Sequence, residues 1–150
     1  MKTVPHYVRV PPTERLPDVR TLAPFKAVIV IGAPYPYEWQ EEVSTWLVEN
    51  GCRYMMAWGP DCSSWDDSVD RADIKARNYE DDDQKFVMTT WHDDESLESV
   101  FWYSQFCGIF SCDEIELINA VILDISHEDR SAELLELFEQ SKTLAEREQD

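Results

Sequence analysis

The sequence predicts an α/β fold: a small three-layer sandwich with a mostly parallel sheet of four to five strands and a flavodoxin-like or Rossmann-like winding. Short runs of β-branched and apolar residues alternate four times with longer segments whose apolar residues recur at helical spacing. Such alternation is typical of right-handed strand–helix–strand units wound into a parallel sheet. The length of 150 residues suits one domain with a single core.

The first regular elements follow a proline-rich segment. Five prolines fall within residues 1–24, which argues against a regular helix and predicts an extended, basic N-terminal arm ahead of a single α/β domain at residues 25–150. Within the arm, residues 7–10 are suited to pair as an edge strand. Residues 26–31 form a β-branched run typical of a buried parallel strand. Residues 38–50 then place Trp39, Val43, Trp46 and Leu47 on one helical face, and Gly51 ends the helix.

Three more strands and helices follow in the same rhythm. We expect strands at residues 52–58, 86–91 and 115–125, and helices that start near residue 64, at residue 96 and at residue 130. The helix at 96–107 has apolar residues nearly all round and should be the most buried one. The sequence does not decide the strand order. An order of 2-1-3-4 would bring the loops after the first and third strands together at the switch point, where open α/β sheets meet their ligands.

The charge of the chain is strongly acidic and unevenly distributed. The formal net charge is −18, and residues 1–31 carry five Lys or Arg against two Asp or Glu. This first segment has a net charge of +3, which leaves −21 on residues 32–150. Such a field repels nucleic acid and anionic lipid and speeds encounters with basic proteins. We therefore expect a basic protein partner, no direct nucleic-acid binding and no membrane binding, with the arm packed on the acidic body of its own chain or of a second copy in a homodimer.

The cysteines and the apolar runs indicate the compartment. The four cysteines stand at 52, 62, 107 and 112, with neither C-x-x-C nor zinc-knuckle spacing, and no signal peptide pattern precedes them. Reduced thiols are the expectation. The longest wholly apolar runs, such as residues 27–31, have five residues, whereas a membrane-spanning helix needs about 18–20. We expect a soluble, cytoplasmic protein.

Aromatic and acidic side chains gather at the ends of three predicted strands. In a parallel sheet these ends share one edge, so the side chains should form one surface. Aromatic anchors ringed by carboxylates suit a partner that bears Arg or Lys, or a small cationic ligand, although aromatic residues at strand ends also serve as core lining. The predicted partner-binding residues are Tyr35, Tyr37, Trp58, Asp61, Asp66, Asp67, Trp91, His92, Asp93 and Asp94.

Catalytic, cofactor and metal sites find weaker support. Neither G-x-G-x-x-G nor G-x-x-x-x-G-K-[ST] occurs, so we predict no nucleotide cofactor. Cys62 precedes a helix and His92 ends a strand, so the two would form a catalytic pair if their loops met. The surrounding carboxylates raise the pKa of a thiol, which argues against this pair. His92, Asp93, Asp94 and Asp61 carry metal-ligating groups, but neighbours on a strand point in opposite directions, so we predict a solvated acidic cap and no metal.

Two stretches resemble the hallmark sequences of an uncharacterised bacterial domain family of similar length. They are W-G-P-D-C-S-S-W-D-D-S-V-D at residues 58–70 and F-V-M-T-T-W-H at residues 86–92. The resemblance runs from about residue 24 to residue 126 and leaves the basic arm at 1–23 outside. It implies no activity, cofactor or partner.

These observations favour an acidic cytosolic binding protein that docks onto a basic protein partner, with a toxin-neutralising immunity protein as the most concrete instance. The alternative is a small-ligand-binding protein or enzyme that uses Cys62, His92 and the aspartates at the carboxyl edge of the sheet. A DNA-mimicking inhibitor is a further alternative, and it would need carboxylates spaced along an elongated face.

Overall fold

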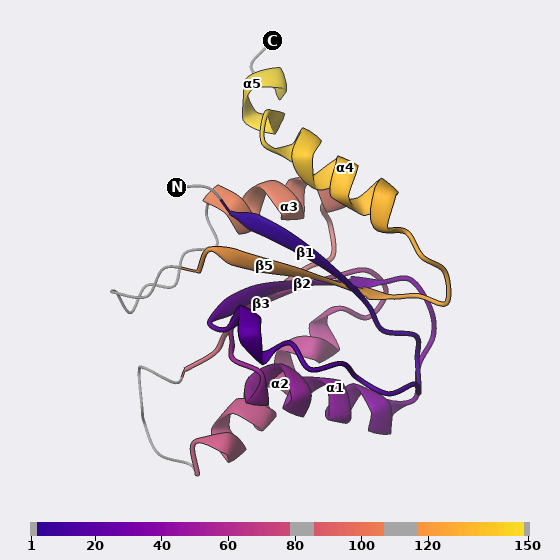
Figure 1. Ribbon diagram of the computed structural model, residues 1–150, viewed down its shortest axis with the longest axis vertical. Coiled ribbons are helices and arrows are strands. Elements are labelled where there is room, and N and C mark those ends of the chain that lie inside the picture. The colour runs from indigo at the N-terminus through magenta and orange to yellow at the C-terminus, as the bar shows by residue number, and fades with distance from the viewer. Residues whose placement is uncertain (1–2, 79–85, 107–116, 149–150) are drawn as a thin grey trace.

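The computed structural model describes residues 3–78, 86–106 and 117–148, and a five-stranded parallel sheet forms its centre. The order is β1-β5-β2-β3-β4, so β1 and β4 are the edges (Figure 1). All neighbouring strands run parallel. The strands are β1 (Val4–Arg9), β2 (Phe25–Ile31), β3 (Cys52–Trp58), β4 (Met88–His92) and β5 (Asn119–Ile125). The expected α/β sandwich with a mostly parallel sheet is confirmed.

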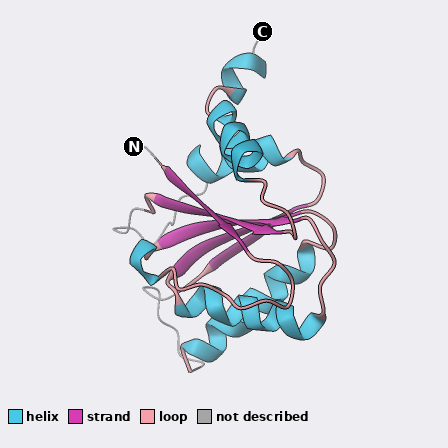
Figure 2. Ribbon diagram, turned by 45° about the vertical axis from the view of Figure 1, so that its right-hand side comes forward, coloured by secondary structure: helices cyan, strands magenta, loops and turns pink. Residues whose placement is uncertain are grey.

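Helices cover both faces of the sheet, which makes the three layers visible in Figure 2. The helices α1 (Tyr37–Glu49) and α2 (Ser63–Ala76) lie on one face. The helices α3 (Leu97–Phe106) and α4 (Ser131–Ser141) lie on the other, and α5 (Leu144–Glu148) continues beyond α4. No helix in the described parts of the chain is long and apolar enough to cross a membrane.

The central strand β2 is buried along its whole length because both of its faces are covered. Ala27 and Ile29 pack with Val43 of α1 and Val69 of α2. The alternate residue Val28 packs in the other core cluster, with the aromatic side chains of α3 and α4. This two-sided burial explains why the strand reads as a continuous apolar run rather than as an alternating one.

The proline-rich segment is attached to its own chain at several points. It begins as β1, close to the expected edge strand at residues 7–10, and then crosses the layer of α1 and α2 to the short 3-10 helix η1 (Arg20–Leu22) (Figure 1). Val10 and Val19 are buried in the core on that side. The indole nitrogen of Trp46 also donates a hydrogen bond to the carbonyl oxygen of Pro17, at 2.6 Å.

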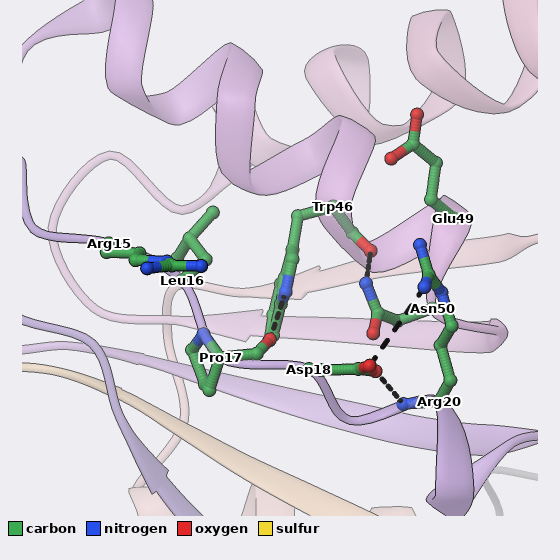
Figure 3. Close-up of a pocket in the computed structure, with 8 residues that line it drawn as sticks. All are labelled: Arg15, Leu16, Pro17, Asp18, Arg20, Trp46, Glu49 and Asn50. Atoms are coloured by element: carbon green, nitrogen blue, oxygen red, sulfur yellow. Dashed lines mark hydrogen bonds and ion pairs between the residues drawn. The ribbon is translucent and has the colours of Figure 1, made fainter.

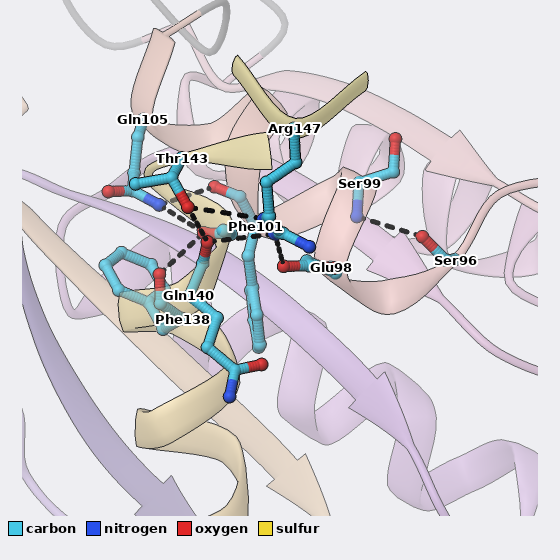
Figure 4. Close-up of polar contacts among 10 residues, drawn as sticks. Ser96, Glu98, Ser99, Phe101, Gln105, Phe138, Gln140, Thr143 and Arg147 are labelled. Atoms are coloured by element: carbon cyan, nitrogen blue, oxygen red, sulfur yellow. Dashed lines mark hydrogen bonds and ion pairs between the residues drawn. The ribbon is translucent and has the colours of Figure 1, made fainter. Parts of the chain in front are cut away.

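The C-terminal helices are tied to α3 by polar contacts (Figure 4). Arg147 of α5 forms an ion pair with Glu98 of α3. Gln105 of α3 donates from its amide to the Ser141 hydroxyl of α4, at 2.7 Å. The predicted closing helix at 130–147 is two helices, and the second contacts α3 through the Arg147–Glu98 ion pair.

One expectation from the sequence is wrong in detail. The helix at 96–107 is not the most buried one, because Phe106 is 49% exposed and Trp102 is only half-buried. The strand order, which the sequence left open, places the four predicted strands in the order 4-1-2-3. The helices that follow β2 and β5 lie on opposite faces of the sheet, so the switch point lies between these two neighbouring strands.

Candidate functional site

A cavity of about 600 Å³ opens at the carboxyl edge of the sheet, between the loops that follow β2 and β3. Its lining consists of residues 31–35, Tyr37 and Gln40 of α1, and Pro60 with Asp61. This volume is in the range of small-ligand sites in proteins. The predicted site residues Tyr35, Tyr37 and Asp61 thus share one cavity.

The two tyrosines are fixed in different ways. Tyr35 is half-buried, and its ring lies 5.5 Å from that of Trp65 in an edge-on arrangement. Its hydroxyl accepts a hydrogen bond from the Trp65 indole nitrogen at 2.8 Å, and burial raises its pKa. Tyr37 is 60% exposed, and its hydroxyl accepts from Arg71, whose charge is balanced by Glu41 at 2.5 Å. Tyr35 is therefore a fixed side chain in the wall of the cavity, and Tyr37 is an exposed side chain at its rim.

The loop after β3 presents Asp61 through two unusual backbone conformations. Gly59 has a φ of 122°, and a Cβ there would lie 2.9 Å from the carbonyl oxygen of Ile31. Asp61 has a φ of 58°, in the left-handed region that costs a non-glycine residue energy. Because Gly59 packs this closely on the end of β2, the loop holds the exposed Asp61 at the cavity.

Side chains of Asp124, Arg130 and Tyr7 meet at the switch point, beside the cavity residue Gly32. Asp124 is fully buried at the end of β5 and forms an ion pair with Arg130. The Tyr7 hydroxyl donates to Asp124 Oδ2 at 2.6 Å, and the pKa of Tyr7 is raised to about 12, chiefly by burial. A Cβ on Gly32 would lie 2.6 Å from the guanidinium of Arg130. The charges of Asp124 and Arg130 therefore balance each other.

The structure does not bring the side chains of Cys62 and His92 together. Cys62 is buried in the core on the α1 and α2 side. Its thiol is close to the backbone of His92 and not to the imidazole ring. The His92 ring lies against Tyr103 of α3 on the opposite face, with its two nitrogens 3.0 Å from Thr90 and Glu95. Burial is the main cause that raises the pKa of the Cys62 thiol, and Asp93 raises it further. A buried thiol that stays protonated is a poor nucleophile.

The end of β4 carries a second group of predicted site residues. Trp91 is 47% exposed, and the neighbouring Asp93 and Asp94 are exposed as well. Trp58 is half-buried, and its indole nitrogen donates to the carbonyl oxygen of Glu95 at 2.7 Å. Trp58 therefore anchors the loop after β4, whereas Trp91 is available to a partner.

The remaining predicted residues lie on α2 beside β4. The Thr89 hydroxyl hydrogen-bonds to Asp66 and lies 3.0 Å from Asp70 Oδ1. Burial raises the pKa of Asp70, and the adjacent carboxylates raise it further. Asp67 is exposed. Asp66 thus has a structural contact, while Asp67 belongs to the acidic surface.

A second cavity, of about 480 Å³, lies between the arm and the C-terminal end of α1 (Figure 3). Residues 15–18 and Arg20 line it from the arm, and Trp46, Glu49 and Asn50 line it from α1. The side chain of Asn50 joins the two, because its oxygen accepts from the backbone of Val19 at 3.0 Å. Helices of parallel sheets run opposite to the strands, so this cavity is at the amino edge, away from the predicted site.

No group of three or more metal-ligating side chains converges within the described ranges. Cys52 and Cys62 are buried free thiols. The acidic run at 80–83, Cys107 and Cys112 lie outside the described residues. The exposed groups at the carboxyl edge suit binding of a cation or a hydrogen-bond donor.

Comparison with known sequences supports the resemblance seen in the hallmark stretches. The family model of a domain of unknown function, DUF7684, matches residues 5–141. The chain belongs to this family. The match begins inside β1, so the DUF7684 domain includes most of the proline-rich segment instead of starting near residue 24. No curated protein and no solved structure matches the chain significantly.

Sequence reasoning missed Gln40, Asp124 and Arg130. Gln40 falls on the apolar face of α1, where it is only 4% exposed. Asp124 is the one acidic residue of β5 and interrupts an otherwise apolar run at residues 120–125. A lone polar residue in a buried stretch needs a partner, and this signal would have pointed to both positions.

Proposed function

We propose that this DUF7684 protein is a binding protein whose carboxyl edge docks onto the basic surface of a protein partner. A toxin-neutralising immunity protein is the most concrete instance, because masking a cationic active site requires a complementary field and a few anchors. The observation that carries the proposal is the exposure of Tyr37 and Trp91 at an edge that also exposes Asp61, Asp93 and Asp94.

Aromatic rings and carboxylates contribute differently to such an interface. Exposed Trp and Tyr are the side chains that most often hold a partner, because they bury a large area with little loss of side-chain entropy. Carboxylates steer a basic partner toward the edge and mainly raise the association rate. The net charge of −18 makes this steering long-ranged at low salt.

The enzyme alternative has less support. Cys62 and His92 face opposite layers of the structure, and burial keeps the thiol protonated. A small cationic ligand at the cavity is the part of that alternative that agrees with the site.

Partner capture followed by binding kinetics tests the proposal. The purified protein captures candidates from a lysate of its native host, and each is measured in a salt series. One variant replaces Asp61, Asp93 and Asp94 by Asn, and two others truncate Tyr37 or Trp91 to Ala. A matched control neutralises Glu136, Glu139 and Glu146, which lie on α4 and α5.

We expect a basic partner whose association slows with salt and in the carboxylate variant but not in the control. Each aromatic truncation should speed dissociation by an amount worth about 1–2 kcal/mol or more. An acidic partner would contradict the proposal, and so would binding kinetics that change neither with salt nor in any of these variants.

A further inference from the structure

The walls of the carboxyl-edge cavity are mostly apolar and flat. Pro34 and Pro60 come from the two loops, Tyr35 is held edge-on against Trp65, and Ile31 ends the central strand. Planar groups stack well on aromatic and proline surfaces of this kind, and cations are attracted to aromatic faces.

Two polar groups at the cavity, the side chains of Gln40 and Asp61, offer hydrogen-bond acceptors. Gln40 donates from its amide nitrogen to Ser64 Oγ at 3.0 Å and to Ser68 Oγ at 3.3 Å. Ser64 donates its own proton to the Asp61 carbonyl, so it must accept from Gln40, and this fixes the amide orientation. Gln40 Oε1 accepts no hydrogen bond from any described residue, although the side chain is 96% buried and lines the cavity.

The second acceptor is the carboxylate of Asp61 at the mouth of the cavity. The positive charges near this cavity are already balanced. Arg71 at the Tyr37 hydroxyl is paired with Glu41, and Arg130 beside Gly32 is paired with Asp124. The cavity thus combines an unpaired neutral acceptor inside with a carboxylate at its mouth.

We propose that this cavity binds a guanidinium group, supplied by an arginine side chain of the partner. The inference rests on the proposed function and names the chemistry that the site recognises. A guanidinium is planar, always charged and carries five donors, so it can stack on the walls while it donates to Asp61 and Gln40. An ammonium group is more strongly hydrated and would lose more on entering a mostly apolar cavity.

The site is built before any ligand arrives. Gly59 packs on Ile31 and Asp61 is held in the left-handed conformation, so the carboxylate does not have to be recruited from a mobile chain. The Gln40 amide is fixed by two serines of α2. Fixed acceptors lower the ordering cost of binding and favour a ligand whose donors have a rigid arrangement.

L-argininamide titrated into the intact protein tests the inference, with L-lysinamide and the uncharged isostere L-citrullinamide as ligand controls. The readouts are the ¹H–¹⁵N shifts of the Gln40 side-chain amide and of the Gly32 backbone. Asp61→Asn removes the charge and keeps a residue type that tolerates a positive φ. Ala33→Phe fills the cavity, and Glu136→Gln, on α4, is the matched charge control.

We expect saturable one-site binding of argininamide, with both control ligands about tenfold weaker or worse. Asp61→Asn should weaken it by about tenfold, Ala33→Phe should abolish it, and Glu136→Gln should leave it within about twofold. If Ala33→Phe unfolds the protein, the argininamide affinity of Asp61→Asn decides whether the inference stands. The inference is overturned if no saturable shift appears at the cavity, or if Asp61→Asn binds as tightly as the wild type.

The two proposals fail separately. A basic partner that binds Ala33→Phe as tightly as wild type, yet responds to salt and to Trp91→Ala, overturns the guanidinium site and leaves the docking edge standing. Argininamide binding without any basic partner shows that the cavity takes a guanidinium group, but it overturns the docking proposal and the partner's arginine as the source of that group.

Discussion

Asp124 and Arg130 form an ion pair in which the Asp124 side chain is fully buried and the Arg130 side chain remains 28% exposed. The Tyr7 hydroxyl donates to the same carboxylate, so three segments of the chain meet at one buried charge. Asp124→Asn should lower the free energy of unfolding by about 2–3 kcal/mol, because the partly exposed Arg130 keeps some of its water. Urea denaturation measures the loss.

A double-mutant cycle separates this pair from general damage to the core. Arg130→Gln combined with Asp124→Asn should cost less than the sum of the two single changes, since each single change leaves an unpaired partner. Glu136→Gln, exposed on α4, should change stability by no more than about 0.5 kcal/mol. Strict additivity would show that the two charges do not stabilise each other.

Lys26 is expected to make stability rise with pH. Burial lowers the pKa of Lys26 to about 8, from 10.5 in an exposed lysine. The unfolded chain holds this proton up to about pH 10.5 and the folded chain only up to about pH 8. Raising the pH across that window therefore favours the folded state, by up to about 3 kcal/mol.

The Lys26 effect is measured as the difference between wild type and Lys26→Met in urea denaturation at several pH values. The subtraction is necessary because Cys52 has the opposite effect. Burial raises the pKa of Cys52 to about 12, so the unfolded chain loses that proton first, and the contribution of Cys52 to stability falls above about pH 9. Lys75→Met, on the exposed side of α2, is the control. An equal pH dependence in wild type and Lys26→Met would contradict the prediction.

Gly59→Ala should destabilise the protein and also weaken argininamide binding. The new Cβ would lie 2.9 Å from the Ile31 carbonyl oxygen, at a φ of 122° that suits only glycine. We expect a loss of about 2 kcal/mol or more in unfolding free energy. Asp61→Gly in the same loop relieves a left-handed conformation and should not lower the melting temperature. A neutral Gly59→Ala would mean that the loop is not fixed.

Cys62 should react slowly and be dispensable for binding. In the native protein at pH 7, we expect iodoacetamide to modify the Cys62 peptide more than about tenfold more slowly than after unfolding, as followed by mass spectrometry. Cys62→Ala should change partner affinity by less than about twofold. Rapid native alkylation, or a large loss of binding with folding intact, would favour the enzyme alternative.

The sequence predicts the layers of the fold well but leaves the order of the strands open. Strand β3 begins and ends at the predicted residues, because Gly51 and Gly59 flank it. Helix α1 is displaced by one residue, and α2 begins one residue before the predicted start. Strand order depends on contacts between distant segments, such as β5 beside β2, which no local pattern encodes. The aromatic pattern of α3 also predicts burial, yet Phe106 is at the surface, since apolar residues are not confined to the interior.

The sequence also predicts part of the candidate site. Tyr37, Asp61 and Trp91 are found at the carboxyl edge because a strand end fixes the edge on which the next residues lie. The pairing of Cys62 with His92 depended on which face each side chain takes. Alternation along β4 sends the His92 ring toward α3, away from the thiol.

The position of β4 at the edge of the sheet affects the solubility of the purified protein. Among the described residues this strand pairs only with β3, and Trp91 is exposed on it. Edge strands invite pairing between molecules unless charge prevents it. Here Asp66 and Asp70 contact Thr89 of the strand, and the exposed Asp93 and Asp94 follow its end. The net charge of the chain falls to zero near its sequence pI of about 4.3, so purified samples should stay clear at neutral pH and turn cloudy near about pH 4.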